Sequence, residues 1–436
     1  MPNFTALPGF RDFYPEDFAV RAHIVRAWRE VARRYGFQEY DGPPLEPLDL
    51  YVEKSGPEIV QQLYNFTDKG GREVALRPEM TPTFARMVGA RAGGLRKPVK
   101  WFSIPQLFRY ERQQRGRLRE HFQLNCDIVG EESVSTDAEL VALSIDMLRA
   151  LGLTADDFVA RISDRRLLRA LLVHAGVAEE RLVVVYNIVD KLEREPREVL
   201  ARRLVEEAQL DAAIAERVLE IFRHRDFSAV RATYGAVEGI AEEVARLSEF
   251  FATLEAMGLG EYVRFDLSIV RGLAYYTGIV FELFDVRGEL RAICGGGRYD
   301  RLLQQIAGVD LPALGFGMGD VVLRELLADR GLLPTTAQEV DYFVIAVTPA
   351  ERDLMLGLVH RLRDAGHSVE YALKPQGVGK QFKNASAVGA RRVLVLGPDE
   401  VAEGVAVLRD MRSGEERRVP LDRIQDAASG IQGNTP

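Results

Sequence analysis

Cysteine is scarce in this chain of 436 residues, which has only Cys126 and Cys294. They lie far apart in the sequence, and such sparse use favours a reducing compartment over a disulfide framework or a structural zinc site. The six histidines show no HExxH or comparable ligand spacing. The sequence therefore predicts no transition metal held by protein ligands.

Long apolar runs are also missing. No stretch approaches the roughly 20 residues of a transmembrane helix, and residues 1–10 lack the basic and apolar regions of a signal peptide. We therefore expect a soluble, cytoplasmic protein. A positive charge excess is lacking too, because the formal net charge is −8. This charge argues against sequence-blind nucleic-acid binding, so an RNA partner would have to dock on local basic patches.

The apolar pattern predicts a mixed α/β chain of two or three domains. A stripe at helical spacing predicts a helix that ends at Gly36, and it consists of Val20, Ile24, Trp28, Val31 and Tyr35. Residues 64–66 and 73–76 flank a turn and predict a hairpin. A charged, mostly helical block at 182–257 precedes strands expected at 263–266, 279–284 and 289–294.

A domain boundary is predicted near Leu333 and Pro334, after which strands alternate with helices. Strands are expected at 342–347, 367–371 and 392–396, and Thr348 to Glu351 forms a capping box before a helix. This alternation predicts a small sheet of largely parallel strands. Residues 426–436 have no periodicity and are expected to be a tail.

The segment 108–130 concentrates arginine. Arg109 and Glu111 are expected on a strand, and a loop around Gly116 then carries Arg112, Arg115, Arg117 and Arg119. Like charges at this density repel one another, whereas the planar guanidinium matches phosphate bidentately, so the loop indicates a polyanion. The alternative is a solvated basic turn. On the returning strand, alternation places three polar side chains on one face, namely Gln123, Asn125 and Asp127.

Three glycine-rich segments follow. In residues 271–278, Arg271 beside Tyr275 and Tyr276 offers hydrogen bonds and a flat wall to a small polar ligand. Residues 294–300 contain three consecutive glycines, as expected where backbone approaches a ligand closely. The alternative for either segment is a tight turn with a structural arginine. The glycines of 315–319 favour close strand–helix packing over dinucleotide binding.

Together these segments resemble the histidyl-tRNA synthetases, a family of class II aminoacyl-tRNA synthetases, over nearly the whole chain. Residues 9–15 (GFRDFYP) resemble the opening signature, and the helix ending at Gly36 with Pro43 resembles motif 1. FRYE, the arginine loop and FQLNCDIVG resemble motif 2. Residues 269–276 (IVRGLAYY) and 296–300 (GGRYD) resemble the histidine-specific signatures.

The resemblance implies an α+β catalytic domain on an antiparallel sheet at 1–330, with a helical insertion at about 175–257. It implies an α/β anticodon-binding domain at 338–425 and a tail at 426–436. The implied reaction is the ATP-dependent attachment of L-histidine to its tRNA through a histidyl-adenylate. Magnesium would be carried with ATP, and the chain would form a homodimer.

The resemblance also assigns site residues. Arg109 and Arg271 match the catalytic arginines on opposite sides of the α-phosphate. Glu111 matches the acid that accepts a hydrogen bond from the adenine amino group. The residues expected to bind histidine are Glu79, Thr81, Arg109, Gln123, Asp127, Arg271, Tyr275 and Tyr276. Those expected to bind ATP are Arg109, Glu111, Arg117 and Arg119.

The chain departs from the family at motif 3, which normally reads Gly-Leu-Glu-Arg and holds the γ-phosphate. Val322 occupies the arginine position, and Arg324 lies about 200° away around a helix. We therefore expect Arg117 or Arg119 to take over that phosphate. Ala274 also replaces an aspartate usual before the tyrosine pair.

Two alternatives remain. The first is a non-catalytic regulatory subunit of ATP phosphoribosyltransferase, which generally lacks the C-terminal domain. Here that domain is present, and the basic residues available to bind RNA phosphates are Lys374, Lys380, Lys383, Arg391 and Arg392. A class II synthetase for threonine, proline or glycine shares that domain, but the Arg-Gly-Leu-x-Tyr-Tyr element argues against it.

Overall fold

The computed structural model describes residues 4–110, 116–192, 194–224, 226–270, 275–335 and 340–424. The chain divides into two compact units, Met1–Pro334 and Thr335–Pro436. Within the described ranges, no helix combines the length and apolar character that a bilayer span requires.

A nine-stranded sheet forms the centre of the first unit. Its order is β1-β5-β7-β12-β11-β10-β8-β9, with β6 paired to β7. The pairs β1–β5 and β8–β9 are parallel and the others described are antiparallel, which confirms the predicted fold class. The strands are β1 (Gln38–Glu39), β5 (Val99–Ser103), β6 (Gln106–Phe108), β7 (Glu120–Val129), β8 (Phe158–Asp164), β9 (Val263–Phe265), β10 (Ile279–Asp285), β11 (Cys294–Arg298) and β12 (Ala313–Gly319).

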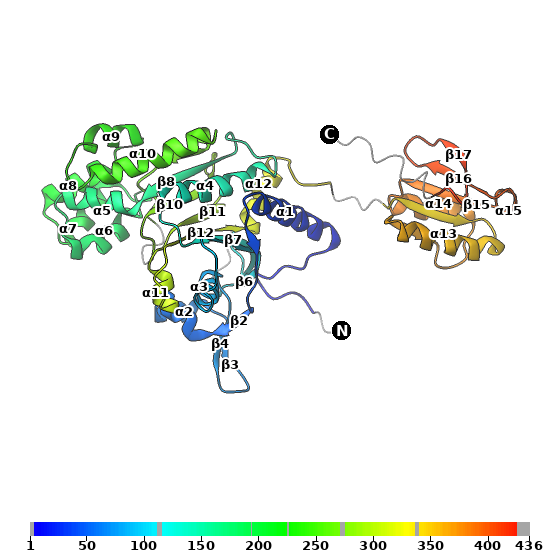
Figure 1. Ribbon diagram of the computed structural model, residues 1–436, viewed down its shortest axis with the longest axis horizontal. Helices are drawn as coiled ribbons and strands as arrows, with labels where there is room; N and C mark the ends of the chain where they lie inside the picture. Colours follow the sequence, from blue (N-terminus) through cyan, green and yellow to red (C-terminus); the bar gives the residue numbers. More distant parts are fainter. Residues whose placement is uncertain are drawn as a thin grey trace. The chain divides into compact units, whose positions relative to one another are not determined.

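The two faces of this sheet carry different layers (Figure 1). One face packs into the main core with α1 (Pro15–Arg34), α4 (Val134–Arg149), α10 (Ala241–Ala256) and α12 (Asp320–Asp329). The other face meets a smaller core with α3 (Thr81–Gly89) and α11 (Leu302–Ala307). Near these helices lie α2 (Leu48–Ser55) and a small sheet of β2 (Leu45–Pro47), β4 (Glu73–Leu76) and β3 (Asn65–Thr67). The β3–β4 pair confirms the predicted hairpin.

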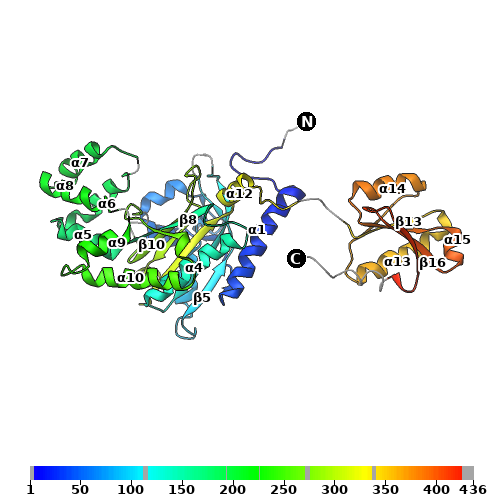
Figure 2. The ribbon, with the colours of Figure 1, turned by 90° about the horizontal axis from the view of Figure 1, so that it is seen from above.

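Short helices gather at one end of the first unit in both views (Figures 1 and 2). They begin after β8, and their buried leucines and valines join the main core. They are α5 (Arg165–His174), α6 (Leu182–Val189), α7 (Arg197–Glu206), α8 (Ala212–Ile221) and α9 (Phe227–Tyr234).

Helix α1 follows the predicted pattern. Pro15 begins it, acidic residues occupy its first turn, and Gly36 follows it at φ 75°, a conformation that glycine adopts without a Cβ clash. Ile24 and Trp28 are buried within the same chain. The apolar stripe therefore packs internally and leaves a different face of α1 for other contacts.

Two strand predictions were wrong. Strand β6 ends at Phe108, so Arg109 lies just beyond it. Residues 289–293 are not a strand, and β11 begins only at Cys294 and runs through the glycines. The reason is close approach between strands. A Cβ on Gly296 would lie 2.5 Å from the carbonyl oxygen of Gly315 on β12, so only glycine allows this pairing.

The second unit has a five-stranded sheet in the order β14-β13-β15-β16-β17. The pairs β13–β14 and β13–β15 are parallel, whereas β16 and β17 add antiparallel pairs, so the expectation of largely parallel strands held only for the first three. Helices α13 and α14 cover opposite faces. The elements are β13 (Tyr342–Ala346), α13 (Arg352–Asp364), β14 (Val369–Tyr371), α14 (Val378–Ala387), β15 (Arg392–Leu396), α15 (Pro398–Ala402), β16 (Val405–Asp410) and β17 (Glu416–Pro420).

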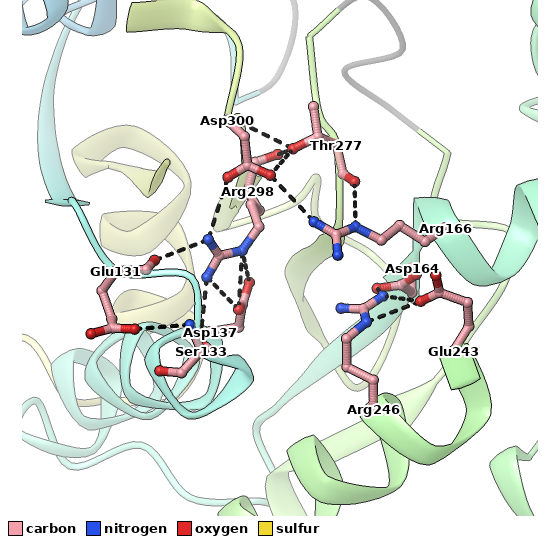
Figure 3. Close-up of polar contacts among 10 residues, drawn as sticks. All are labelled: Glu131, Ser133, Asp137, Asp164, Arg166, Glu243, Arg246, Thr277, Arg298 and Asp300. Carbon is pink, nitrogen blue, oxygen red and sulfur yellow. Dashed lines mark hydrogen bonds and ion pairs between the residues drawn. The ribbon is translucent and has the colours of Figure 1, made fainter. Parts of the chain in front are cut away.

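A buried arginine links the sheet of the first unit to its helical layer (Figure 3). Arg298 is the last residue of β11. Its Nε–H is shared between the two oxygens of the Asp137 carboxylate of α4, at 3.1 and 3.2 Å, and its Nη2 donates to the same carboxylate at 2.6 Å. Its Nη1 reaches Asp300 at 3.3 Å, and Asp300 accepts the Thr277 hydroxyl at 2.8 Å. The network therefore ties the segment before β10 to β11 and α4.

Replacing Arg298 by Ala should destabilise the protein by about 3–5 kcal/mol, because it leaves Asp137 charged and buried without a partner. Both side chains of the pair are 3% exposed. Arg33→Ala is the matched control, since the pair with Glu30 is 73% and 51% exposed and is screened by solvent, so its loss should change stability far less. Thermal unfolding of the two variants checks this, and equal losses would contradict it.

Candidate active site

A cavity of about 1030 Å³ opens over strands β7, β12, β11 and β10. Most of the residues predicted from sequence line it, namely Glu79, Thr81, Arg109, Arg117, Gln123, Asp127, Tyr275 and Tyr276. Arg119 is described but does not line this cavity, and its guanidinium instead lies 4.6 Å from the centre of the Tyr110 ring. Glu111 and Arg271 lie outside the described residues.

Alternation along β7 forms the polar floor of the cavity. Gln123, Asn125 and Asp127 line it together, whereas Leu124, Cys126 and Ile128 belong to the main core. The same alternation brings in a residue that the sequence analysis missed, since His121 also lines the cavity two positions earlier.

The neighbouring strand β12 makes room for these side chains. The register pairs Asp127 with Gly315, Asn125 with Gly317 and Gln123 with Gly319. A Cβ on Gly315 would stand 2.0 Å from the Asp127 carboxylate, and one on Gly317 would stand 2.8 Å from the Gln123 amide. The prediction of strand–helix packing for these glycines was therefore wrong, because they accommodate side chains from the adjacent strand.

Asp127 is the most deeply buried carboxyl group of the cavity. The Tyr299 hydroxyl donates a hydrogen bond to its carboxylate. Burial raises the pKa of Asp127 to about 7, although the Tyr299 hydrogen bond and the charge of Lys54 oppose that rise. The group can therefore accept a hydrogen bond as a carboxylate or donate one as an acid near neutral pH.

A buried lysine holds a second carboxylate at the cavity. The Lys54 ammonium forms an ion pair with Glu79 and lies 4.4 Å from the centre of the Tyr275 ring. Tyr275 in turn packs against Tyr276, with ring centroids 4.3 Å apart. Lys54 thus positions an acidic and an aromatic wall together, and no local sequence pattern marks it.

Positive charge gathers on the part of the cavity wall formed around motif 2. Arg109 donates from Nε to the carbonyl of Pro78 at 3.0 Å, which orients its guanidinium. Arg117 and Arg291 line the same cavity. Arg291 and Tyr299 were not predicted as site residues. Tyr299 belongs to the GGRYD motif, so the sequence could have indicated it, whereas Arg291 belongs to no motif.

The described residues contain no group of three or more His, Cys, Asp or Glu side chains placed to hold a metal ion. Cys126 and Cys294 are free and buried.

His121 remains neutral in the folded chain. Burial, with the nearby positive charges of Arg109 and Arg11, lowers the pKa of His121 to about 3. An unfolded histidine titrates near 6.5. Between these values the unfolded chain binds more protons, so this group makes folding stability fall as pH falls.

His121→Gln should therefore reduce the loss of stability on acidification from pH 7 to 5 by about 2 kcal/mol. Thermal unfolding at the two pH values measures it. The control is His174→Gln, which changes an exposed histidine on α5 of the same unit. An equal pH dependence in wild type and His121→Gln would show that His121 is not held neutral.

Comparison with known proteins agrees with this geometry. The family model for histidyl-tRNA synthetase matches residues 9–320, and the model for an anticodon binding domain matches residues 341–429. A histidine–tRNA ligase of Opitutus terrae is 48% identical, over 98% of both chains. A chloroplastic/mitochondrial histidine–tRNA ligase of Arabidopsis thaliana is 42% identical, over 96% of this chain and 85% of that one. The crystal structure of histidyl-tRNA synthetase from Nostoc sp. PCC 7120 shares the fold, with a TM-score of 0.83 at 24% identity over 98% of this chain and 99% of that chain. The chain belongs to the histidyl-tRNA synthetase family.

Proposed function

We propose that this protein attaches L-histidine to its tRNA, using ATP and a histidyl-adenylate intermediate. Family membership and near full-length similarity to histidine–tRNA ligases support the reaction. The observation that carries the choice of amino acid is the buried Asp127, held by Tyr299 in a glycine-cleared recess. Such a group matches an imidazole N–H, and leaving it unpaired would disfavour other amino acids.

The first step joins two anions. The histidine carboxylate attacks the α-phosphorus of ATP, the bond to the bridging oxygen breaks, and pyrophosphate leaves. Arg109 would neutralise the carboxylate and α-phosphate, and Arg271, outside the described residues, would act from the opposite side. Charge placed in advance where negative charge accumulates stabilises the transition state, and alignment of the reactants supplies much of the remaining effect. A hydroxyl of the terminal adenosine of tRNA then attacks the carbonyl carbon and releases AMP.

The histidine subsite combines charge, hydrogen bonds and a flat wall. Glu79, held by Lys54, would accept the substrate ammonium together with Thr81, and Gln123 would contact the same backbone end. Asp127 would accept from the imidazole, with Tyr275 and Tyr276 as the wall. Glu111 would accept a hydrogen bond from the adenine amino group. Arg117 and Arg119 would bind the phosphates of ATP and the acceptor end of tRNA.

The anticodon-binding match at residues 341–429 supports tRNA as the partner. The regulatory alternative is disfavoured because relatives covering nearly all of this chain are ligases. Magnesium would enter with ATP, since it prefers phosphate oxygens and water and would there neutralise phosphate charge. We place the enzyme in the cytoplasm, where its two free cysteines would stay reduced.

A homodimer is proposed from the outward face of α1. That face bears a groove lined by apolar side chains and arginines, and Phe18 within it is 50% exposed. A two-fold interface on this face would cover its exposed apolar side chains. Sedimentation should give a dimer at micromolar concentration, and Phe18→Asp should shift it toward monomer. A stable, active monomer would contradict the proposal.

Pyrophosphate exchange into ATP, measured with each of the twenty amino acids, should depend on histidine. Asp127→Asn should raise the KM for histidine at least about tenfold and leave the KM for ATP nearly unchanged, because the lost charge faces the amino-acid side chain. Asp156→Asn, an exposed carboxylate, is the matched control. Well-folded protein without histidine-dependent exchange would overturn the proposed function.

A further inference from the structure

Helix α12 begins at the cavity without contributing positive charge to it. Val322, where the family pattern has arginine, lines the cavity and is 7% exposed. Asp320 is buried and accepts the Arg11 guanidinium at 2.9 Å. Arg324 points to another partner, since its Nη2 lies 2.6 Å from the Asp17 carboxylate. A triphosphate at this wall would therefore need its cation from another element.

Arg291 supplies a guanidinium at this place. It lies in the connection between β10 and β11 and lines the cavity with Gly116 and Val322. A Cβ on Gly116 would lie 3.2 Å from Val322 Cγ2 and 3.6 Å from Arg291 Cδ. Val322 and the stem of Arg291 therefore both adjoin Gly116 in this part of the wall.

The backbone around Arg291 is held on both sides. Leu290 and Ile293 are buried, and the Ile293 N–H donates to the Leu283 carbonyl at 2.8 Å. Asp285, at the root of the connection, is ion-paired with Arg330 at 2.5 Å. A fixed backbone limits the positions that the Arg291 guanidinium can take, so less entropy is lost when it binds an anion.

The strand register separates this wall from the proposed histidine subsite. Asp127 lies opposite Gly315, whereas Gln123 lies opposite Gly319, immediately before α12. Four residues along a strand span about 13 Å. Asp127 therefore lies well separated along β7 from the end of the cavity at α12, which Val322 and Arg291 line. The most highly charged part of ATP is its triphosphate, which would lie at the α12 end, beside Arg291.

We propose that Arg291 binds the β- and γ-phosphates of ATP and supplies the charge that Val322 does not. The inference rests on ATP being the substrate, as in the proposed function. Arg117 lines the same end and would share the phosphates, whereas Arg119 lies against Tyr110. Arg291 would thus act on nucleotide binding and on the departing pyrophosphate, without touching histidine.

Equilibrium binding of ATP, AMP and pyrophosphate with saturating magnesium tests the proposal directly. Arg291→Ala should weaken ATP and pyrophosphate binding at least about tenfold, because it removes a charge-assisted contact, and should change AMP binding less than about twofold. In pyrophosphate exchange, the KM should rise for ATP and not for histidine. Arg287→Ala is the matched control, since Arg287 is exposed on the same connection and does not line the cavity.

A second variant tests the location of the charge. Val322→Arg combined with Arg291→Ala should recover part of the ATP affinity, and thermal unfolding verifies that each variant is folded. Equal losses of ATP and AMP binding, or an Arg291→Ala variant that matches Arg287→Ala, would overturn the inference even if the enzyme is active. Wild-type protein that binds ATP through Arg291 but shows no histidine-dependent exchange would instead overturn the proposed function alone.

Discussion

The pairing of β7 with β12 is the constraint on which the candidate site depends. Each polar side chain of the β7 floor faces a glycine, because Gly315, Gly317 and Gly319 oppose Asp127, Asn125 and Gln123. Any larger residue at the first two positions would occupy the space of the polar groups. A shift of one residue would turn the polar face of β7 into the apolar core. One register thus specifies both the core and the cavity floor.

Buried charges hold the walls around that floor. Arg298 joins β11 to α4 through Asp137 and, through Asp300, to Thr277 just after the tyrosine pair. Lys54 likewise holds two parts of the wall together, through its ion pair with Glu79 and its contact with the Tyr275 ring. Removing one partner from such a pair leaves an uncompensated charge, so these interactions favour a single arrangement of the walls. Within the signature GGRYD, Arg298 therefore has a structural role, whereas Tyr299 faces the cavity.

The distribution of charge in the cavity explains how one recess can suit two very different substrates. Asp127 and Glu79 are acidic residues of its lining, and Arg109, Arg117 and Arg291 are basic ones. The distance between Asp127 and the α12 end of the cavity follows from strand β7 rather than from any loop. A change such as valine at position 322 can then be offset from a neighbouring connection, because a phosphate responds to charge and not to the element that carries it.

Much of this protein follows from local sequence. Helical spacing located α1 with its end at Gly36, the capping box located the start of α13, and strand alternation placed Gln123, Asn125 and Asp127 on one face. These features depend on interactions between residues a few positions apart, so a short segment of sequence is enough to predict them. The family resemblance added the class of fold and the candidate residues.

The tertiary structure decided what depends on contacts between distant segments. The glycines at 295–297 were expected where backbone approaches a ligand, with a tight turn as the alternative, and those at 315–319 at a strand–helix contact. Strand pairing places both sets inside the sheet, where Gly295, Gly315, Gly317 and Gly319 line the cavity. Lys54 and Arg291 belong to no motif, and only the fold brings Lys54 to Glu79 and Arg291 to the Gly116 and Val322 part of the wall. Local pattern specifies which face a side chain takes, whereas the partner across a sheet or a cavity is set by register and packing over the whole domain.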